Sequence, residues 1–212
     1  MPPEKKSYYG QIRTDVLELL PQNIKIEKSL DVGCGIGKTS AYLKSKYNIR
    51  ETVGIEYVPE IAKAAEANID RVYNLSIDDD DLPFSPNEFD LILLADILEH
   101  LADPWGVAKR LASFLKPGGY AIFSLPNVQN WKIILKLLSG KWEYQDQGIM
   151  DRTHLRFFTV GSSLQLVRQA GLKPLKTVRT MGNELKMVNR LSLGLFKNIL
   201  TFHIYISSQK EF

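Results

Sequence analysis

Three glycines at alternate positions form the densest group of potential ligand-binding residues in the chain. Gly33, Gly35 and Gly37 lie in the segment SLDVGCGIGKT, between a strand-like apolar run and an amphipathic stretch. Glycine lacks the Cβ that would hold a ligand away from the backbone, and a helix N-terminus offers unpaired N–H groups with partial positive charge. The turn therefore suits a carboxylate or a phosphate, although glycines also occur where a helix only packs tightly on a strand.

An acid follows the next apolar run, about 20 residues beyond the glycines, where its carboxylate could accept both hydroxyls of a ribose. This acid is Glu56, and a simple surface acid is the alternative interpretation. The G-x-G-x-G spacing lacks the third glycine of the dinucleotide pattern, and the chain has no triphosphate-binding G-x-x-x-x-G-K-[ST] loop. Among common ligands with a ribose and a carboxylate, S-adenosylmethionine remains.

The elements that must position these residues alternate between strand-like runs and amphipathic stretches, which is typical of a parallel sheet with helices on both faces. We predict an α/β fold: a Rossmann-like, doubly wound, seven-stranded sheet, mostly parallel, with an antiparallel edge strand. The predicted strands span residues 29–33, 52–56, 71–75, 89–95, 120–125, 173–180 and 201–207. The predicted helices span residues 8–20, 38–46, 59–68, 104–115, 131–138, 160–170 and 184–199.

The whole chain, residues 1–212, is expected to form one domain, since its length supports one full-sized core. Asp103 is expected to cap the helix that begins at Pro104. Strict alternation stops after Pro126, and residues 127–158 form an insertion after the carboxyl end of a strand. Substrate contacts gather at such positions in open α/β sheets, so we predict that the insertion covers the substrate.

Composition excludes several classes of partner. The chain has 27 basic and 24 acidic residues, a net charge of +3, which indicates no general attraction to nucleic acid. A single cysteine, Cys34, excludes a disulfide framework and a thiolate metal cluster and favours a reducing compartment. No segment has the length of a membrane span. We therefore expect a cytoplasmic monomer or homodimer without a metal ion, and interpret the acidic run Asp78–Asp81 as a solvated loop.

Four segments resemble, in their usual order, the motifs of class I S-adenosylmethionine-dependent methyltransferases. They are LDVGCGIGKTSAYL, VGIEYVPEIAKAAEAN with its acid, DDDDLPFSPNEFDLILLADILEHLADP, and LKPGGYAIFSLPN. The stretch GKWEYQDQGIMDRTHLRFFT is similar to a branch of small-molecule methyltransferases associated with ubiquinone-like and polysaccharide-related pathways. The resemblance covers residues 28–172 and implies methyl transfer to a small-molecule or saccharide-linked acceptor.

The resemblance also implies roles for individual residues in binding the cofactor. The three glycines would contact its methionyl part, Glu56 would bind the ribose hydroxyls, and Asp31 would orient the loop. Tyr57 would lie along the adenine. Asp78 or Asp79 would accept a hydrogen bond from the adenine amino group, with Asp78 preferred because it aligns with the usual acid before the Leu-Pro-Phe segment.

Two residues are expected to border the methionyl moiety and the transferred methyl, namely Ala95 and Asp96. His154 is the predicted general base, because it lies in the insertion and imidazole can take a proton near neutral pH. His100 is a second candidate, with local packing as its alternative role. The alternative for the loop around His154 is a polar latch in which Arg152 pairs with Asp151.

The acceptor is less well defined by the sequence. Five aromatic residues in the insertion are candidates to line its pocket: Trp131, Trp142, Tyr144, Phe157 and Phe158. At least half of them are expected to be core residues instead. The Asn/Asp-Pro-Pro-aromatic signature of N-methyltransferases is replaced by Leu-Pro-Asn-Val at residues 125–128, which favours an oxygen or carbon acceptor. A catalytically silent module that only binds the cofactor, and a nicotinamide-dependent dehydrogenase, are the alternative functions.

Overall fold

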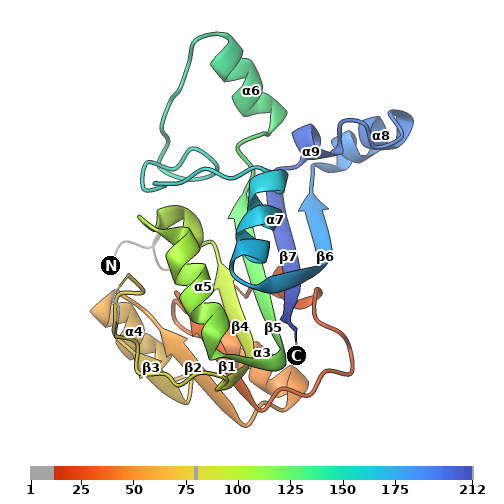
Figure 1. Ribbon diagram of the computed structural model, residues 1–212. Coiled ribbons are helices and arrows are strands. Elements are labelled where there is room, and N and C mark those ends of the chain that lie inside the picture. Colours follow the sequence, from red (N-terminus) through yellow and green to blue (C-terminus); the bar gives the residue numbers. More distant parts are fainter. Residues whose placement is uncertain (1–11, 79–80, 212) are drawn as a thin grey trace.

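A seven-stranded sheet forms the centre of the computed structural model, which describes residues 12–78 and 81–211 (Figure 1). The order of the strands is β3-β2-β1-β4-β5-β7-β6, and β7 runs antiparallel to both of its neighbours while β1 to β5 are parallel. The strands are β1 Lys28–Val32, β2 Glu51–Ile55, β3 Arg71–Tyr73, β4 Phe89–Ala95, β5 Leu115–Pro126, β6 Leu172–Thr180 and β7 His203–Lys210. The predicted fold class, including antiparallel pairing of the last two strands at one edge, is confirmed.

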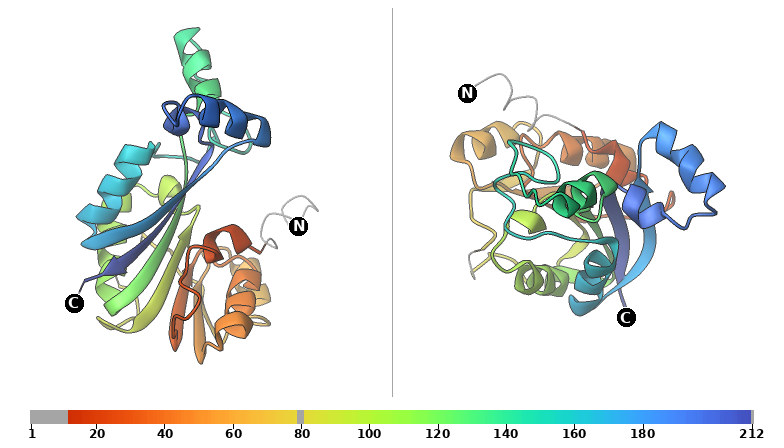
Figure 2. Two further views of the ribbon diagram at one scale, coloured as in Figure 1. Left: turned by 90° about the vertical axis from the view of Figure 1, so that its right-hand side faces the viewer. Right: turned by 90° about the horizontal axis from the view of Figure 1, so that it is seen from above.

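Helices cover both faces of this sheet, and Figure 2 shows α3 and α7 on opposite sides of it. The helices are α2 Thr14–Leu17, α3 Lys38–Tyr47, α4 Pro59–Ala65, the 3-10 helix η1 Leu98–His100, α5 Pro104–Phe114, α6 Trp131–Leu138, α7 Val160–Gln169, α8 Asn183–Leu191 and α9 Lys197–Leu200. Among the described residues, no helix combines the length and apolar character that crossing a membrane would require.

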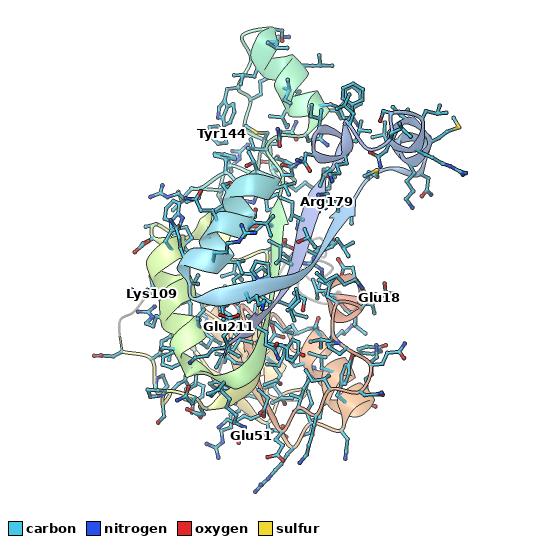
Figure 3. The ribbon with its side chains drawn as sticks, turned by 45° about the vertical axis from the view of Figure 1, so that its right-hand side comes forward. Glu18, Glu51, Lys109, Tyr144, Arg179 and Glu211 are labelled. Atoms are coloured by element: carbon cyan, nitrogen blue, oxygen red, sulfur yellow. The ribbon has the colours of Figure 1, made fainter. Side chains whose placement is uncertain are left out.

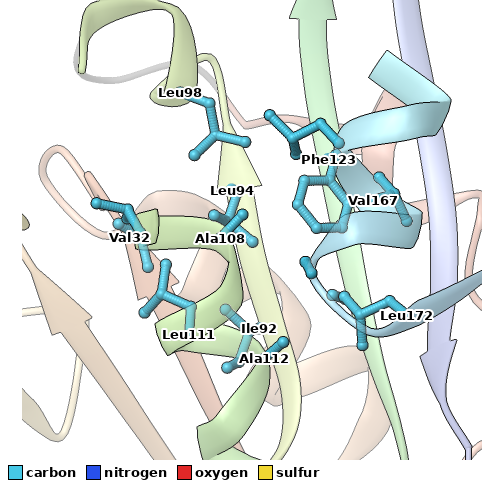
Figure 4. Packing of buried hydrophobic residues seen from close by; sticks show 14 of the residues in the cluster. Val32, Ile92, Leu94, Leu98, Ala108, Leu111, Ala112, Phe123, Val167 and Leu172 are labelled. Atoms are coloured by element: carbon cyan, nitrogen blue, oxygen red, sulfur yellow. The ribbon is translucent and has the colours of Figure 1, made fainter. Parts of the chain in front are cut away.

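The apolar run in β4 shows how the sequence builds two cores. Side chains alternate across a strand, so Ile92 and Leu94 point to one face while Leu91 and Leu93 point to the other. The first pair packs with α5 and α7, as the cluster around Leu111 in Figure 4 shows. The second pair packs with apolar residues of α2 and α3. Burial on both faces explains why β4 is a continuous apolar run rather than an alternating one.

The order of the strands fixes where a ligand can bind. The chain winds outward from β1 to β2 and β3, then returns to place β4 on the other side of β1. In an open α/β sheet this change of direction leaves a crevice at the carboxyl ends of the strands. The glycine turn after β1 and the residues after β4 therefore meet at the same place, at the upper end of the sheet in Figure 1.

Most element predictions are confirmed to within a few residues, and Asp103 caps α5 by accepting a hydrogen bond from the Gly106 N–H (3.0 Å). The leading helix predicted over residues 8–20 is wrong in extent: its described part is helical only over Thr14–Leu17. Residues 8–11 lie outside the described residues. The helix predicted over 184–199 is two helices, because Leu193 and Gly194 adopt positive φ angles of 50° and 80°.

The insertion leaves the sheet and returns to it at the same point. Asn127, directly after β5, forms an isolated parallel bridge with Phe158, and the Val128 N–H donates to the Phe158 carbonyl (2.8 Å). Between these ends, α6 stands away from the sheet with none of its side chains buried (Figure 1). The segment 149–156 instead folds back onto η1. The two halves of the insertion therefore differ in how they pack.

Candidate active site

The glycine turn has the geometry that only glycine adopts without strain. Gly33, Gly35 and Gly37 all have positive φ angles, of 68°, 55° and 80°. A Cβ on Gly33 would lie 2.1 Å from Ile97 Cδ1, so the turn packs directly against the residues that follow β4. Gly37 also precedes α3 as its N-cap, and no side chain in the described part of the chain caps the first N–H groups of that helix. These N–H groups are available to an anion such as a carboxylate.

Glu56 holds the turn after β1 to the turn after β2. Its side chain is buried, with 5% exposed, and Oε2 accepts a hydrogen bond from the Gly35 N–H (3.1 Å). Oε1 accepts one from the Val58 N–H (3.0 Å). A carboxylate has about four lone-pair sites, so each oxygen can still accept a further hydrogen bond, for example from a ribose hydroxyl. The surface-acid interpretation of Glu56 is wrong, because the side chain is enclosed.

Asp31 lies beneath the turn, as the resemblance implies for a residue that orients it. It is buried, and Oδ2 accepts a hydrogen bond from Ser40 Oγ in α3 (2.7 Å). Burial, and then the negative charge of Glu56, raise the pKa of Asp31 to about 6. The carboxyl group thus links the end of β1 to the first turn of α3.

An open hollow lies beside Glu56, at the end of β2 and β3. It is lined by Tyr57, Pro59, Asn74, Leu75 and Ser76. The Asn74 amide donates to the carbonyls of Glu56 (2.8 Å) and Tyr57 (2.9 Å), which fixes one wall of the hollow. The Tyr57 ring is 73% exposed and free to lie along a planar ligand.

The acids expected at the adenine follow this hollow in the chain. Asp78 is exposed, and its N–H donates to Ser76 Oγ (3.2 Å), so it lies next to a residue that lines the hollow. Asp79 lies outside the described residues. The preference for Asp78 over Asp79 therefore stays a prediction.

Asp96 is the centre of a polar network directly after Ala95, the last residue of β4. Its φ is 57°, and its carboxylate accepts hydrogen bonds from Ser124 Oγ (2.7 Å) and His203 Nε2 (2.6 Å) and pairs with Arg13. Burial opposes ionisation of Asp96, but the His203 hydrogen bond and the charges of His203 and Arg13 hold its pKa well below the ordinary value. Asp96 is thus a fixed negative charge at the carboxyl end of β4.

Arg13 and His203 are site residues that sequence reasoning missed. The Arg13 N–H donates to Thr39 Oγ1 (3.2 Å), which also places this cation near the start of α3. His203 begins β7, beside the end of β5. Neither residue is part of a motif: one precedes a short helix and the other lies in an apolar strand, so no signal in the sequence pointed to them.

The predicted base, His154, is buried with 9% exposed, and its Nδ1 lies 3.0 Å from the Ile149 carbonyl oxygen. Its ring meets that of His100 edge-on, with centroids 4.8 Å apart. Glu99 is also buried, and burial raises its pKa well above the ordinary value. Burial, and then the charge of His154, lower the pKa of His100. The structure thus places His154, from the insertion, against His100, the last residue of η1.

The loop around His154 does not have the ion pair that the latch interpretation predicts between Arg152 and Asp151. Arg152 forms its ion pair with Asp146 (2.7 Å) rather than with Asp151. Asp151 instead accepts hydrogen bonds from the N–H (2.8 Å) and hydroxyl (2.7 Å) of Thr153. Asp151 thus forms an Asx-type turn with Thr153, two residues later, and these hydrogen bonds occupy the carboxylate that was expected to pair with Arg152.

The aromatic residues of the insertion divide into two groups. Phe158 is buried in the core. Trp142 and Tyr144 surround Phe157, with ring centroids 5.2 Å and 6.4 Å from it, and both are substantially exposed. Figure 3 shows Tyr144 on the segment below α6. Trp131 lies at the start of α6 and is partly exposed. The expectation that at least half of the five aromatic residues belong to the core is therefore wrong, because only Phe158 is buried. A role of the other four in an acceptor pocket stays a prediction.

Comparison with known proteins identifies the same architecture. Residues 5–177 match a family model described as a methyltransferase domain. The ubiquinone biosynthesis O-methyltransferase of Thiobacillus denitrificans is 30% identical over 182 residues, covering 82% of this chain and 76% of that protein. The chloroplastic tocopherol O-methyltransferase of Arabidopsis thaliana is 38% identical over 104 residues, covering 46% of this chain and 30% of that protein.

A solved structure with the same fold is that of an S-adenosylmethionine-dependent methyltransferase from Mesorhizobium loti. Its TM-score is 0.66 at 16% sequence identity, over 93% of this chain and 96% of that one. The glycine turn without Cβ atoms, the uncapped start of α3 and the enclosed Glu56 fit the methionyl and ribose parts of this cofactor. The chain belongs to the class I S-adenosylmethionine-dependent methyltransferases, and S-adenosylmethionine is its cofactor.

Proposed function

We propose that this enzyme transfers the methyl group of S-adenosylmethionine to a hydroxyl oxygen of a small molecule. The observation that carries the proposal is the group of proton-accepting side chains just beyond the carboxyl end of β4, where Glu99 and His100 lie with His154 packed against His100. A hydroxyl must lose its proton as its oxygen is methylated, and such groups assist that loss. The names of the two curated relatives, both O-methyltransferases, support the same choice.

The chain's own residues account for binding of the cofactor, which supplies a methyl group on a positively charged sulfur. We assign its carboxylate to the uncapped N–H groups of α3 and to Arg13. Its ribose hydroxyls bind Glu56. Its adenine lies in the hollow beside Tyr57, with the amino group toward Asp78 or Asp79. Ala95 and Asp96 border the sulfur and its methyl.

An amine acceptor is less well supported, because the asparagine of the Leu-Pro-Asn segment already has partners. Asn127 is fully buried, and its amide N–H groups donate to the carbonyls of Asn198 (2.8 Å) and Thr201 (2.9 Å). Its Oδ1 accepts a hydrogen bond from the Gln129 N–H (3.2 Å). The side chain thus ties the start of the insertion to α9 rather than facing a substrate.

The reaction needs alignment more than it needs a covalent intermediate. Methyl transfer is an in-line displacement, so the acceptor oxygen must lie on the extension of the sulfur–methyl bond, with water excluded. We propose that residues 127–158 supply that cover. The segment 149–156 holds His154 over η1, and the exposed helix α6 forms the outer part of the cover. His154 is the residue proposed to take the hydroxyl proton.

Pairs of acceptors that differ only in the accepting atom test the proposal. The enzyme is incubated with S-adenosylmethionine and either a catechol or the corresponding aminophenyl compound, and methylated products are identified by mass spectrometry. Methylation of the catechol oxygen supports the proposal. Methylation of the amine alone would refute it, and binding of S-adenosylhomocysteine without transfer to any acceptor, including those in a cell extract, would support the silent binding module instead.

A further inference from the structure

Three potential metal ligands converge beside the carboxyl end of β4. Glu99, His100 and His154 each place one ligand atom within 4.8 Å of the ligand atoms of the other two. The first two residues belong to η1, and the third comes from the insertion, 54 positions after His100 in the chain. Two imidazoles and one carboxylate form a donor set that divalent transition metals bind.

Hydrogen bonds fix which nitrogen of each imidazole is free. The Ile149 carbonyl can only accept, so the His154 Nδ1 that lies 3.0 Å from it carries the proton. Thr153 donates its hydroxyl proton to Asp151 (2.7 Å), so its oxygen accepts from His100 Nδ1 (3.1 Å). The Thr153 carbonyl lies 3.3 Å from the same nitrogen. Each neutral ring therefore keeps its lone pair on Nε2, and a carbonyl partner on the other nitrogen is the usual second shell of a metal-binding histidine.

One oxygen of the Glu99 carboxylate has no hydrogen-bond partner among the described residues. Glu99 is 1% exposed, and its Oε2 is buried without a hydrogen bond. A buried carboxylate oxygen without a partner is costly, and such groups in proteins are usually paired or coordinate a metal. The position of Glu99 is nevertheless fixed, because its backbone carbonyl accepts hydrogen bonds from the N–H groups of Leu155 (2.8 Å) and Arg156 (3.0 Å). These bonds also bring His154 to the site.

We propose that Glu99, His100 and His154 bind a divalent transition-metal ion, with Zn²⁺ as its representative. Three protein ligands leave an open position, as in catalytic zinc sites. A tetrahedral zinc site has ligand atoms about 3.4 Å apart, so binding draws the three side chains closer together than they are in the structure. The half-buried ring of His100 forms the accessible side of the site.

The location of the site indicates what the metal does, and this part rests on the proposed function. The cluster begins three residues after Asp96, next to the expected position of the methyl group. An acceptor hydroxyl bound at the open position becomes more acidic, because the metal stabilises its oxygen anion. The released proton leaves to solvent on the accessible side of the site, past the half-buried His100, away from the covered methyl group. The oxygen lone pair forms the new bond to carbon as the sulfur–carbon bond breaks. His154 is then a ligand in the loaded enzyme rather than the base.

Metal titration of the full chain tests the site directly. Protein freed of metal by a chelator is titrated with Zn²⁺ by calorimetry, and with Co²⁺ while visible absorption is recorded, since Co²⁺ reports its own coordination. We expect one equivalent of each metal to bind. Glu99→Gln and His154→Gln should weaken Zn²⁺ binding at least about 100-fold, and Thr153→Val, which removes a partner of His100, about 10-fold. Glu60→Gln is the matched control, because it removes an exposed carboxylate outside the cluster, at the start of α4, and it should bind Zn²⁺ as the unaltered chain does.

The outcomes separate this inference from the proposed function. The metal site is refuted if the chain does not bind one equivalent of Zn²⁺, or if Zn²⁺ binds to Glu99→Gln and to His154→Gln with the affinity that it has for the unaltered chain. Calorimetric binding of S-adenosylhomocysteine to each variant shows whether its fold is intact. O-methylation by the metal-free enzyme at an undiminished rate would refute the catalytic role of the metal and leave the proposed function standing. Binding of one Zn²⁺ by an enzyme that methylates only amines would leave the metal site standing and refute the proposed function.

Discussion

Glu56→Gln is the substitution that separates charge from shape at the cofactor site. Glutamine has nearly the size of glutamate, but it carries no charge and replaces one acceptor oxygen with an amide N–H₂ group. In the structure both carboxylate oxygens accept backbone N–H groups, from Gly35 and from Val58. The amide nitrogen of the variant must therefore face one of these donors and repel it, which loosens one of the two turns.

The magnitude follows from the hydrogen bonds to ribose. A hydrogen bond to a charged group contributes about 1.5–3 kcal/mol, whereas one between neutral groups contributes about 0.5–1.5 kcal/mol. Two ribose hydroxyls on one carboxylate thus lose about 2–3 kcal/mol between them when the charge is removed. This corresponds to roughly 30- to 150-fold weaker binding of S-adenosylhomocysteine. Loosening of the turn adds to the loss.

Calorimetric titration with S-adenosylhomocysteine measures the effect, and circular dichroism shows that the variant is folded. Glu60→Gln is the matched control, since Glu60 is exposed at the start of α4 and should leave the affinity unchanged. A folded Glu56→Gln variant that binds within about threefold of the unaltered chain, a difference below 1 kcal/mol, would refute the assignment of Glu56 to the ribose.

Three further substitutions test the surroundings of the site. Gly33→Ala should weaken cofactor binding, because the Ile97 side chain must move away from a Cβ that would lie 2.1 Å from its Cδ1, at the turn that binds the cofactor. Gly140→Ala, with a similar φ of 75° but open space, should cost only the backbone strain of about 1–2 kcal/mol and leave binding unchanged; equal effects on binding would contradict the close packing. Asp31 has a pKa of about 6 in the fold and 3.8 ordinarily, so its ionisation lowers the free energy of unfolding by up to about 3 kcal/mol as pH rises between these values. Asp31→Asn should remove that decline, and a pH-independent difference between the two proteins in urea denaturation would be evidence against it. Asp103→Ala should cost about 1 kcal/mol of stability by urea denaturation through loss of the α5 cap, and no change would show that the cap contributes nothing.

The fold was predictable because its signals are local. The apolar run Phe89–Ala95 has the length of a buried strand and proves to be β4 with the predicted bounds. Asp103 and Pro104 mark the start of α5 in the same way. Where two neighbouring residues, Leu193 and Gly194, leave the helical region, the apolar periodicity continues and gives no warning. Periodicity reports which face is buried, not whether the backbone is continuous.

The cofactor side of the site was also predictable, because it lies in two turns that follow consecutive strands. The acceptor side was not, since its residues meet only through tertiary packing. Arg13 and His203 reach Asp96 from residues 83 and 107 positions away in the chain. The absence of a metal was predicted from cysteine count and the acidic run, and neither bears on a cluster that joins His100 to a histidine in the insertion. Spacing along the chain cannot reveal such groups.

Binding of S-adenosylhomocysteine to the purified chain, with reduced nicotinamide adenine dinucleotide titrated in parallel, tests the central claim most directly. The glycine turn, the free N–H groups of α3 and the enclosed Glu56 predict saturable, one-to-one binding of S-adenosylhomocysteine and none of the dinucleotide. Binding of the dinucleotide alone would contradict the assignment of the cofactor and with it the account of the site given above.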